Sequence, residues 1–127
     1  IGLALQDKEI CIFGDGKQKR NLLFVDDAVD AILDVVKREK CIGQVYFAVG
    51  DDHISVIDLA QQIVDVFGTG KCKTIPWPKE REVTEIGDAI ISNGKLKQDT
   101  DWVPKTSLEM GLKMTQEFYL SQLNKYL

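Results

Sequence analysis

The chain has 127 residues, of which 44% are hydrophobic and 28% are charged, and its formal net charge is −4. This length suits one domain with a modest core. The acidic balance argues against non-specific binding to nucleic acid, which requires clustered positive charge. No apolar run approaches the roughly 20 residues that span a bilayer. We therefore expect neither nucleic acid nor a membrane as a partner.

The cysteines and the histidine are too few and too far apart for a structural metal site. Cys11, Cys41 and Cys72 form no Cys-x-x-Cys pair, and His53 is the only histidine. We therefore expect no bound metal. The odd number of cysteines favours reduced thiols in a cytoplasmic protein. Because the first residue is isoleucine rather than methionine, we expect a piece of a longer protein.

The first part of the chain is predicted to alternate between helices and extended segments. A helical tail, a short strand, a second extended run and a helix are expected over residues 1–5, 10–13, 22–25 and 28–36. Asp26 or Asp27 is placed to cap the last of these helices. Its apolar residues recur at helical spacing, which predicts one buried face.

The middle of the chain is predicted to contain a covered strand followed by a well-delimited helix. Residues 44–49 are nearly all apolar and rich in β-forming types, which is typical of a strand in a parallel sheet. Ser55 and Asp58 have the spacing of a capping box. The helix that follows is expected to end at Gly68.

The last part of the chain is predicted to be mostly helix and loop. A loop is expected over residues 69–73, and the two prolines around Trp77 exclude a helix there. One helical turn is expected over 94–97, and a long amphipathic helix over 108–126. Alternating strands and helices predict an α/β fold with few, short, mostly parallel strands and packed helices.

The loop after the first strand carries the best candidate for ligand binding. Gly14 and Gly16 allow the backbone to approach a ligand closely, because glycine has no Cβ and tolerates positive φ. Arg20 follows, and its planar fork can donate two hydrogen bonds to one phosphate. On spacing alone, a plain hairpin turn remains the more common explanation of the two glycines.

Residues 10–27 resemble the segment I-x-I-[YF]-G-D-G-x-Q-x-R-[DN]-[FLW]-x-x-V-x-D of the extended short-chain dehydrogenase/reductase family. Members of that family are NAD(P)-dependent epimerases and dehydratases of nucleotide-diphosphate sugars. Residues 45–50 and 102–112 are similar to later segments of the family, so the resemblance covers nearly the whole chain. It implies the C-terminal, sugar-nucleotide-binding portion of a Rossmann-type enzyme that resembles UDP-glucose 4-epimerase.

The resemblance also implies roles for particular residues. In the family, the arginine at the position of Arg20 binds the diphosphate of the sugar nucleotide. Ile12 and Phe13 would line the base pocket, and Gly14 and Gly16 would face the ligand. Many epimerases have a second phosphate-binding arginine where this chain has Glu85, and nearby Arg81 is the candidate to replace it.

Two family signatures are missing from this chain. The dinucleotide fingerprint G-x-x-G-x-x-G is absent, and no tyrosine is followed four residues later by lysine, as the family's catalytic pair requires. The resemblance therefore implies that NAD(P) binds to the full-length protein and not to this fragment, which we expect to be inactive alone. A homodimeric parent is expected, and an unpaired sheet edge would favour self-association of the fragment.

Two other functions remain open at this point. One is a stand-alone, non-catalytic nucleotide-binding or regulatory module that uses the same arginine. The other is an unrelated α/β interaction domain, which should bind neither UDP nor dTDP.

Overall fold

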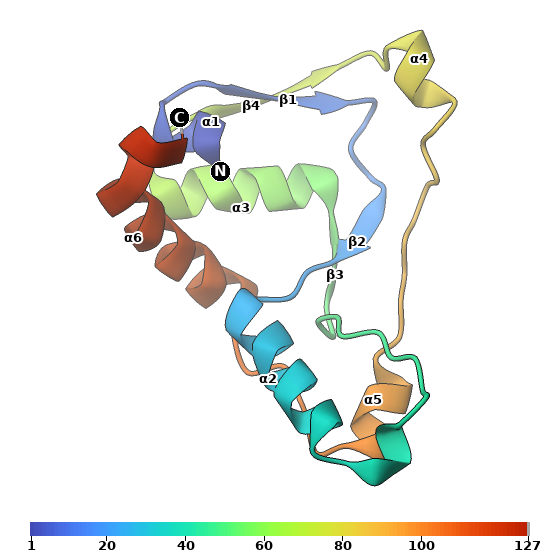
Figure 1. The fold of residues 1–127 in the computed structure, drawn as a ribbon. Helices are drawn as coiled ribbons and strands as arrows, with labels where there is room; N and C mark the ends of the chain where they lie inside the picture. The colour runs from blue at the N-terminus through green and yellow to red at the C-terminus, as the bar shows by residue number, and fades with distance from the viewer. Residues whose placement is uncertain (127) are drawn as a thin grey trace.

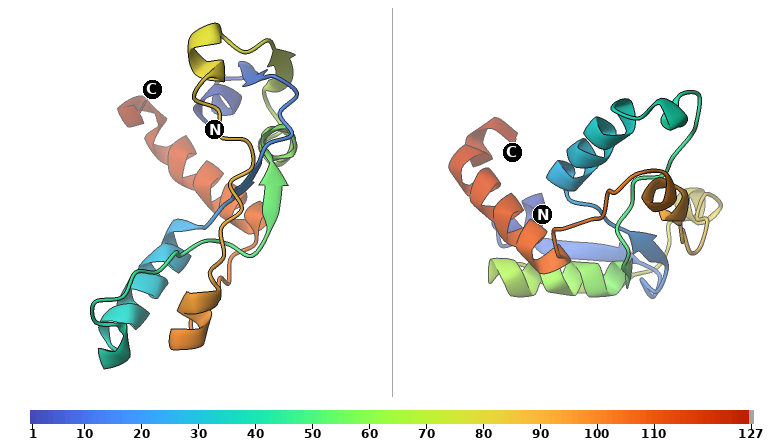
Figure 2. Two further views of the ribbon diagram at one scale, coloured as in Figure 1. Left: turned by 90° about the vertical axis from the view of Figure 1, so that its right-hand side faces the viewer. Right: turned by 90° about the horizontal axis from the view of Figure 1, so that it is seen from below.

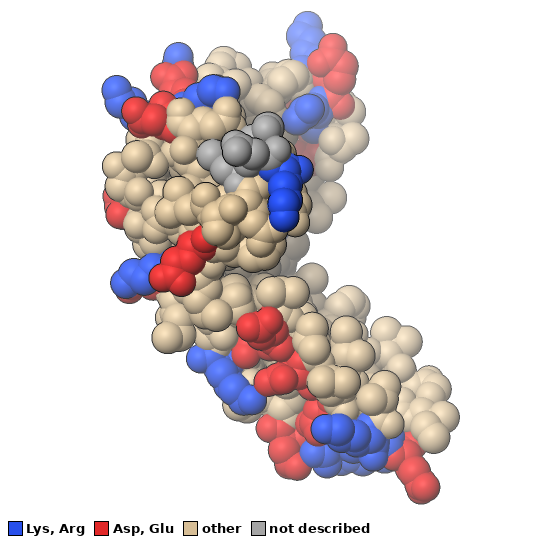
Figure 3. Space-filling view, turned by 60° about the vertical axis from the view of Figure 1, so that its left-hand side comes forward, with Lys and Arg blue, Asp and Glu red and all other residues tan. Residues whose placement is uncertain are grey.

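The computed structural model describes residues 1–126, except for the side chains of residues 123 and 124. The molecule consists of two lobes joined by a narrower waist (Figure 3). We call one the sheet lobe and the other the helical lobe. Both ends of the described chain lie in the sheet lobe (Figure 1). The fold is α/β, as the alternation of predicted elements indicates.

The sheet lobe is built on two parallel strands and three helices. Strands β1 (Glu9–Phe13) and β4 (Lys71–Ile75) pair in parallel, with Phe13 opposite Ile75. Helix α3 (Val56–Phe67) packs against both strands and against α6 (Leu108–Tyr126), and the short α1 (Gly2–Leu5) lies beside it (Figure 1). The buried core of this lobe contains Ala4, Ile63, Phe67 and Leu112.

Helix α3 confirms the predicted start and end signals. The Ser55 hydroxyl accepts a hydrogen bond from the Asp58 backbone N–H at 3.1 Å and donates one to the Asp58 carboxylate at 2.5 Å. Gly68 follows the helix with φ of 70°, a left-handed conformation that glycine adopts without a steric penalty.

The helical lobe packs α2 (Val25–Val36) against α5 (Gly94–Asp99), with the single-turn η1 (Glu39–Cys41) at its tip (Figure 2). Its buried core contains Ala31, Leu96 and Trp102. The indole N–H of Trp102 donates to the Asp27 carbonyl oxygen at 2.9 Å, which fixes the loop before α6 to α2. The helical turn predicted over 94–97 is thus confirmed and slightly longer.

The waist is a two-stranded antiparallel sheet of β2 (Lys19–Asn21) and β3 (His53–Ser55). The extended run predicted at 22–25 therefore lies earlier in the chain, at 19–21. The segment after β4 leads through the short α4 (Lys79–Glu82) and then along β2 to the helical lobe (Figure 1). We call residues 83–91 the strap.

The predicted loop at 69–73 is wrong, because β4 begins at Lys71. Lys71, Cys72 and Lys73 alternate between exposed and partly buried positions, as residues of a strand do. Strand β1 is the parallel partner of this segment.

The predicted strand at 44–49 is also wrong. A strand requires a neighbour to form backbone hydrogen bonds, and in the described chain this segment has none. Its carbonyl groups instead accept from side chains, as when the Asn93 amide donates to the Val49 oxygen at 2.8 Å. Val45 is 76% exposed and Phe47 is 59% exposed, so the segment is not covered on both faces.

Two predictions for α2 are corrected. Phe24 occupies the N-cap position, and neither Asp26 nor Asp27 caps the helix through its side chain. The apolar face that was expected to be buried is largely exposed, because no described element packs on it. The exposed members of that face are Val25, Val29, Ile32, Leu33 and Val36.

Asp27 is buried and ties α2 to the loop before α6. Its carboxylate accepts hydrogen bonds from the backbone N–H groups of Lys105 at 3.1 Å and Thr106 at 2.9 Å. Burial by itself would raise the pKa of Asp27, but these N–H groups favour the ionised form and bring the pKa below its usual value. None of the described helices combines the length and the apolarity needed to cross a membrane.

Candidate functional site

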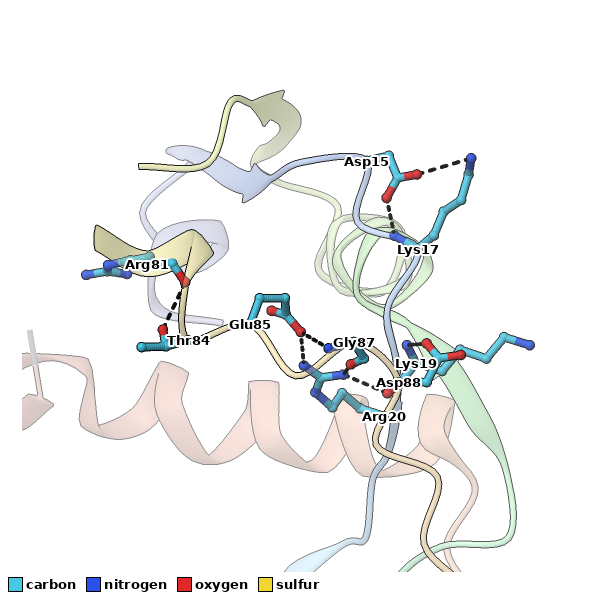
Figure 4. A network of polar contacts seen from close by, with 9 residues as sticks. All are labelled: Asp15, Lys17, Lys19, Arg20, Arg81, Thr84, Glu85, Gly87 and Asp88. Carbon is cyan, nitrogen blue, oxygen red and sulfur yellow. Dashed lines mark hydrogen bonds and ion pairs between the residues drawn. The ribbon is translucent and has the colours of Figure 1, made fainter. Parts of the chain in front are cut away.

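Arg20 lies in the middle of β2, at the waist between the two lobes (Figure 4). It stands opposite Ile54 of β3 in the antiparallel ladder. Its side chain is 29% exposed and reaches toward the strap. Strand geometry thus presents the guanidinium on the side of the waist where residues 85–89 run.

The strap surrounds the Arg20 guanidinium with oxygen atoms. Nη1 donates to the Gly87 carbonyl oxygen at 2.6 Å and to the Lys19 carbonyl oxygen at 2.8 Å. Nη2 donates to Oε1 of Glu85 at 3.1 Å, and this carboxylate also accepts the Gly87 N–H at 2.9 Å. Three of the five guanidinium N–H groups therefore donate to protein oxygens. Within the described part of the chain, Nε–H and one Nη2–H have no such partner and could bind a ligand.

Backbone contacts hold the strap against β2. The Lys19 N–H donates to the Asp88 carboxylate at 2.7 Å, and the Ala89 N–H donates to the Lys19 carbonyl oxygen at 3.0 Å. The Asn21 amide oxygen accepts the Ile91 N–H at 2.9 Å, while its NH₂ group donates to the Gly50 carbonyl oxygen at 3.0 Å. Asn21 therefore connects three separate chain segments at the waist.

A second cluster lies at the carboxyl ends of the parallel strands. The ring of Phe13, at the end of β1, lies 5.3 Å from the ring of Trp77, which follows β4. The guanidinium carbon of Arg81 lies 5.4 Å from the centroid of the Phe13 ring. Two aromatic rings and a cation thus meet at the sheet edge where ligands commonly bind in α/β proteins.

The structure does not bring Arg81 and Arg20 together. Arg81 is exposed on α4 and extends away from Arg20, with Glu85 between the two (Figure 4). The predicted role of Arg81 as a second phosphate ligand therefore has no support in this arrangement. Its observed partner is the Phe13 ring.

The glycine loop is packed against protein side chains. A Cβ on Gly14 would lie 2.4 Å from Nε1 of Trp77, and one on Gly16 would lie 2.8 Å from a methyl group of Ile12. Both glycines have positive φ, and the Gly14 N–H donates to the Ile75 carbonyl oxygen at 2.8 Å. Ile12 is only 3% exposed, so the accessible side chain at this end of β1 is that of Phe13.

A large cleft lies elsewhere on the molecule, away from the predicted site residues. It has a volume of about 1340 Å³ and is lined by parts of α3, α6 and the segments at 22–24, 50–54 and 104–107. None of the six predicted site residues lines it. Among the described residues, no group of histidine, cysteine and carboxylate side chains is arranged to hold a metal ion.

The sequence of this chain is similar to those of known proteins. Residues 1–48 match the model of the NAD dependent epimerase/dehydratase family. The chain is 28% identical to dTDP-glucose 4,6-dehydratase of Xanthomonas campestris pv. campestris (strain B100), over 95% of this chain and 36% of that protein.

Two solved structures share the fold over almost the whole chain. UDP-glucose 4-epimerase of Thermotoga maritima, solved with UDP-glucose, superposes with a TM-score of 0.84 at 28% identity, covering 96% of this chain and 38% of that one. dTDP-glucose 4,6-dehydratase of Bacillus anthracis, solved with NAD, gives a TM-score of 0.77 at 28% identity, covering 94% and 37%.

The chain is similar to NAD-dependent epimerase/dehydratases over almost its whole length. The resemblance predicted from the sequence is thereby confirmed, as is the Rossmann-type α/β fold class. These relatives are dehydratases and epimerases of nucleotide sugars. The chain spans little more than a third of the length of the relatives that it matches.

The described residues do not fit the NAD of these epimerase/dehydratases. A dinucleotide loop leads from a strand into a helix whose N-terminus faces the pyrophosphate. Here the Gly14–Gly16 turn leads into strand β2, and Trp77 closes the space beside Gly14. The described residues therefore supply no dinucleotide-binding loop for the cofactor.

Sequence reasoning placed Arg20 at the site but missed its partners. Gly87 and Asp88 are separated from β2 by more than sixty residues, as the contacts Arg20–Gly87 (67 residues apart) and Lys19–Asp88 (69 apart) show. The only sequence signal was that Glu85 stands where many epimerases have a phosphate-binding arginine. The aromatic contact of Trp77 with Phe13 was likewise not predicted.

Proposed function

We propose that this chain is the C-terminal, sugar-nucleotide-binding portion of an NAD-dependent nucleotide-diphosphate-sugar epimerase or dehydratase resembling UDP-glucose 4-epimerase. The observation that carries the proposal is the placement of Arg20, which is 29% exposed and held rigidly on β2 with donors remaining for an anion. Support also comes from the relatives, one of which was solved with UDP-glucose.

In this proposal the chain binds and orients the nucleotide diphosphate. The remaining N–H groups of Arg20 donate to the diphosphate oxygens, since a guanidinium matches a phosphate geometrically. The Phe13–Trp77 cluster offers flat apolar surface to a nucleobase. Binding energy from these non-reacting parts of the substrate would then orient the sugar for reaction.

The chemistry itself belongs to a part of the parent protein that this chain does not contain. When bound there, NAD would accept a hydride from the sugar. The described residues include no Tyr-x-x-x-Lys pair, so we expect the fragment alone to have no turnover. We further infer a reducing compartment such as the cytoplasm, because Cys11, Cys41 and Cys72 are all free.

The test is a calorimetric titration of the 127-residue chain with UDP-glucose. Replacing Arg20 with methionine should raise the dissociation constant roughly ten- to hundredfold, because a hydrogen bond to a charged group contributes about 1.5–3 kcal/mol. Lys17→Met is the matched control, since Lys17 is exposed and, among the described residues, forms an ion pair with Asp15 alone. Equal binding by the wild type and Arg20→Met would refute the proposal.

The stand-alone binding module remains the second candidate. It uses the same Arg20 site, so the titration does not separate it from the enzyme fragment. The observation in its favour is that the described residues hold neither the dinucleotide fingerprint nor the catalytic pair.

A further inference from the structure

We propose that Glu85 is a specificity-determining residue of the Arg20 site, and that it selects diphosphates of low negative charge. The diester diphosphate of a nucleotide sugar would be favoured over a free nucleoside diphosphate, which has an ionisable terminal phosphate. The inference rests on the proposed function, in which Arg20 binds the diphosphate.

The contact between Glu85 and Arg20 is partly shielded from solvent. Oε1 lies 3.1 Å from Nη2, and the two side chains are 24% and 29% exposed. The other ion pairs of the described chain each include a side chain that is more exposed, except for the pair of Asp34 in α2 and Arg38, which follows that helix. Salt therefore screens the Glu85 charge less than it screens a fully exposed carboxylate.

The position of Glu85 is fixed by the backbone around it. Its carboxylate accepts the Gly87 N–H, while the Gly87 carbonyl oxygen accepts from Arg20, so residues 85–87 close around the guanidinium (Figure 4). Gly87 has φ of 68°, which allows the chain to turn there. Asp88 and Ala89 then bind the backbone of Lys19. A ligand at Arg20 consequently meets a carboxylate that is held by hydrogen bonds to Arg20 and Gly87.

The charge of that carboxylate discriminates between ligands. A terminal phosphate carries about one more negative charge near neutral pH than a phosphate diester, because its second pKa is about 6. If the additional charge lies about 6 Å from Glu85, and the effective dielectric constant is between those of water and a protein surface, the affinity changes on the order of tenfold. Free UDP should therefore be penalised more than UDP-glucose.

The test is a pair of calorimetric titrations, with UDP-glucose and with UDP, on the full 127-residue chain. Glu85→Gln keeps an oxygen that can accept from Arg20 and Gly87 while removing the charge. It should tighten UDP binding on the order of tenfold and tighten UDP-glucose binding clearly less. Glu85→Asp keeps the charge and should keep the preference for UDP-glucose.

Glu82→Gln is the matched control. Glu82 is exposed on the neighbouring helix α4 and undergoes the same change of charge. It should leave the ratio of the two dissociation constants within about twofold, as expected of a screened surface charge.

Two results would overturn the inference while Arg20→Met still weakens binding. If Glu85→Gln weakens both ligands, the carboxylate positions Arg20 instead of selecting among anions. If it tightens both ligands equally, the charge does not discriminate. If Arg20→Met leaves UDP-glucose binding unchanged, the proposed function itself fails, whatever the Glu85 variants do.

Discussion

At the scale of single residues, buried and half-buried polar groups connect distant parts of this chain. Arg20 is one such residue and Asp27 is another, since each accepts or donates hydrogen bonds across more than sixty residues of sequence. An unpaired polar group inside a protein is unfavourable, so each of these side chains specifies where its partner segment must lie.

Replacing Asp27 with asparagine should lower the free energy of unfolding by about 1–3 kcal/mol, because an amide cannot accept from both N–H groups as well as a carboxylate does. Urea denaturation at neutral pH measures this loss. Asp26→Asn is the control. Asp26 is adjacent to Asp27 but exposed, so the same change there should have little effect on the free energy of unfolding.

The pH dependence follows from the direction of the Asp27 pKa shift. Because its pKa is lower in the folded chain than usual, ionised Asp27 stabilises the fold above about pH 4, the ordinary value. This contribution is lost as the pH falls through the folded pKa. Stability of the wild type should therefore fall more steeply than that of Asp27→Asn in that range, and parallel curves would contradict the assignment.

The sequence motif proposes Arg20 as a candidate binding residue, but the residues that surround it could not be predicted. The motif around residues 10–27 singles out the arginine because its spacing is local. Glu85 lies 65 residues away, and only the course of the strap along β2 brings the two together. Contacts of this kind depend on the tertiary path of the chain, which local patterns do not encode.

At the scale of elements, those with local start and end signals were predicted best. Helix α3 has a serine cap and a terminal glycine, both of which are visible in the sequence. Residues 44–49 have a strand composition, but a strand also needs a partner, which composition does not reveal. Strand β4 was missed because its composition is largely polar and does not suggest a strand. It forms a strand nonetheless, because β1 pairs with it.

The turn after β1 provides a test at this scale. Gly14→Ala places a methyl group against Trp77 in a backbone with φ of 69°, whereas Gly43→Ala has a similar φ of 73° and nothing within 4 Å. Both variants should be destabilised by the left-handed backbone, about 1–2 kcal/mol. Gly14→Ala should lose about 1–3 kcal/mol more through overpacking.

Chemical denaturation of the two glycine variants measures the difference. Tryptophan fluorescence should also change in Gly14→Ala and not in Gly43→Ala, because only the former displaces Trp77. Equal destabilisation of the two variants would show that Gly14 is not packed against the indole.

At the scale of the whole molecule, the exposed face of α2 is the main feature that the described chain leaves uncovered. Beside it, Ala31, Val35, Tyr46 and Ala48 help to line a groove of about 240 Å³. Ile32 is 62% exposed and Val36 is 72% exposed. Exposed apolar surface of this kind favours association with a partner.

We predict that the isolated chain self-associates through this face. Replacing Ile32 or Val36 with aspartate should shift sedimentation velocity profiles toward the monomer, because burying an unpaired charge opposes association. Val83→Asp is the control, since Val83 is 83% exposed on the strap, away from α2. A wild-type chain that stays monomeric at the highest attainable concentration would contradict the prediction.

The central claim, that Arg20 binds the diphosphate, is tested most directly by NMR of the ¹⁵N-labelled chain. The Arg20 Nε–H signal can be assigned by its loss in Arg20→Lys and followed as UDP-glucose is added. We predict that this signal shifts and saturates at the dissociation constant found by calorimetry. The claim is contradicted if UDP-glucose binds while the Arg20 signal stays unchanged and signals of Lys105, in the large cleft, move instead.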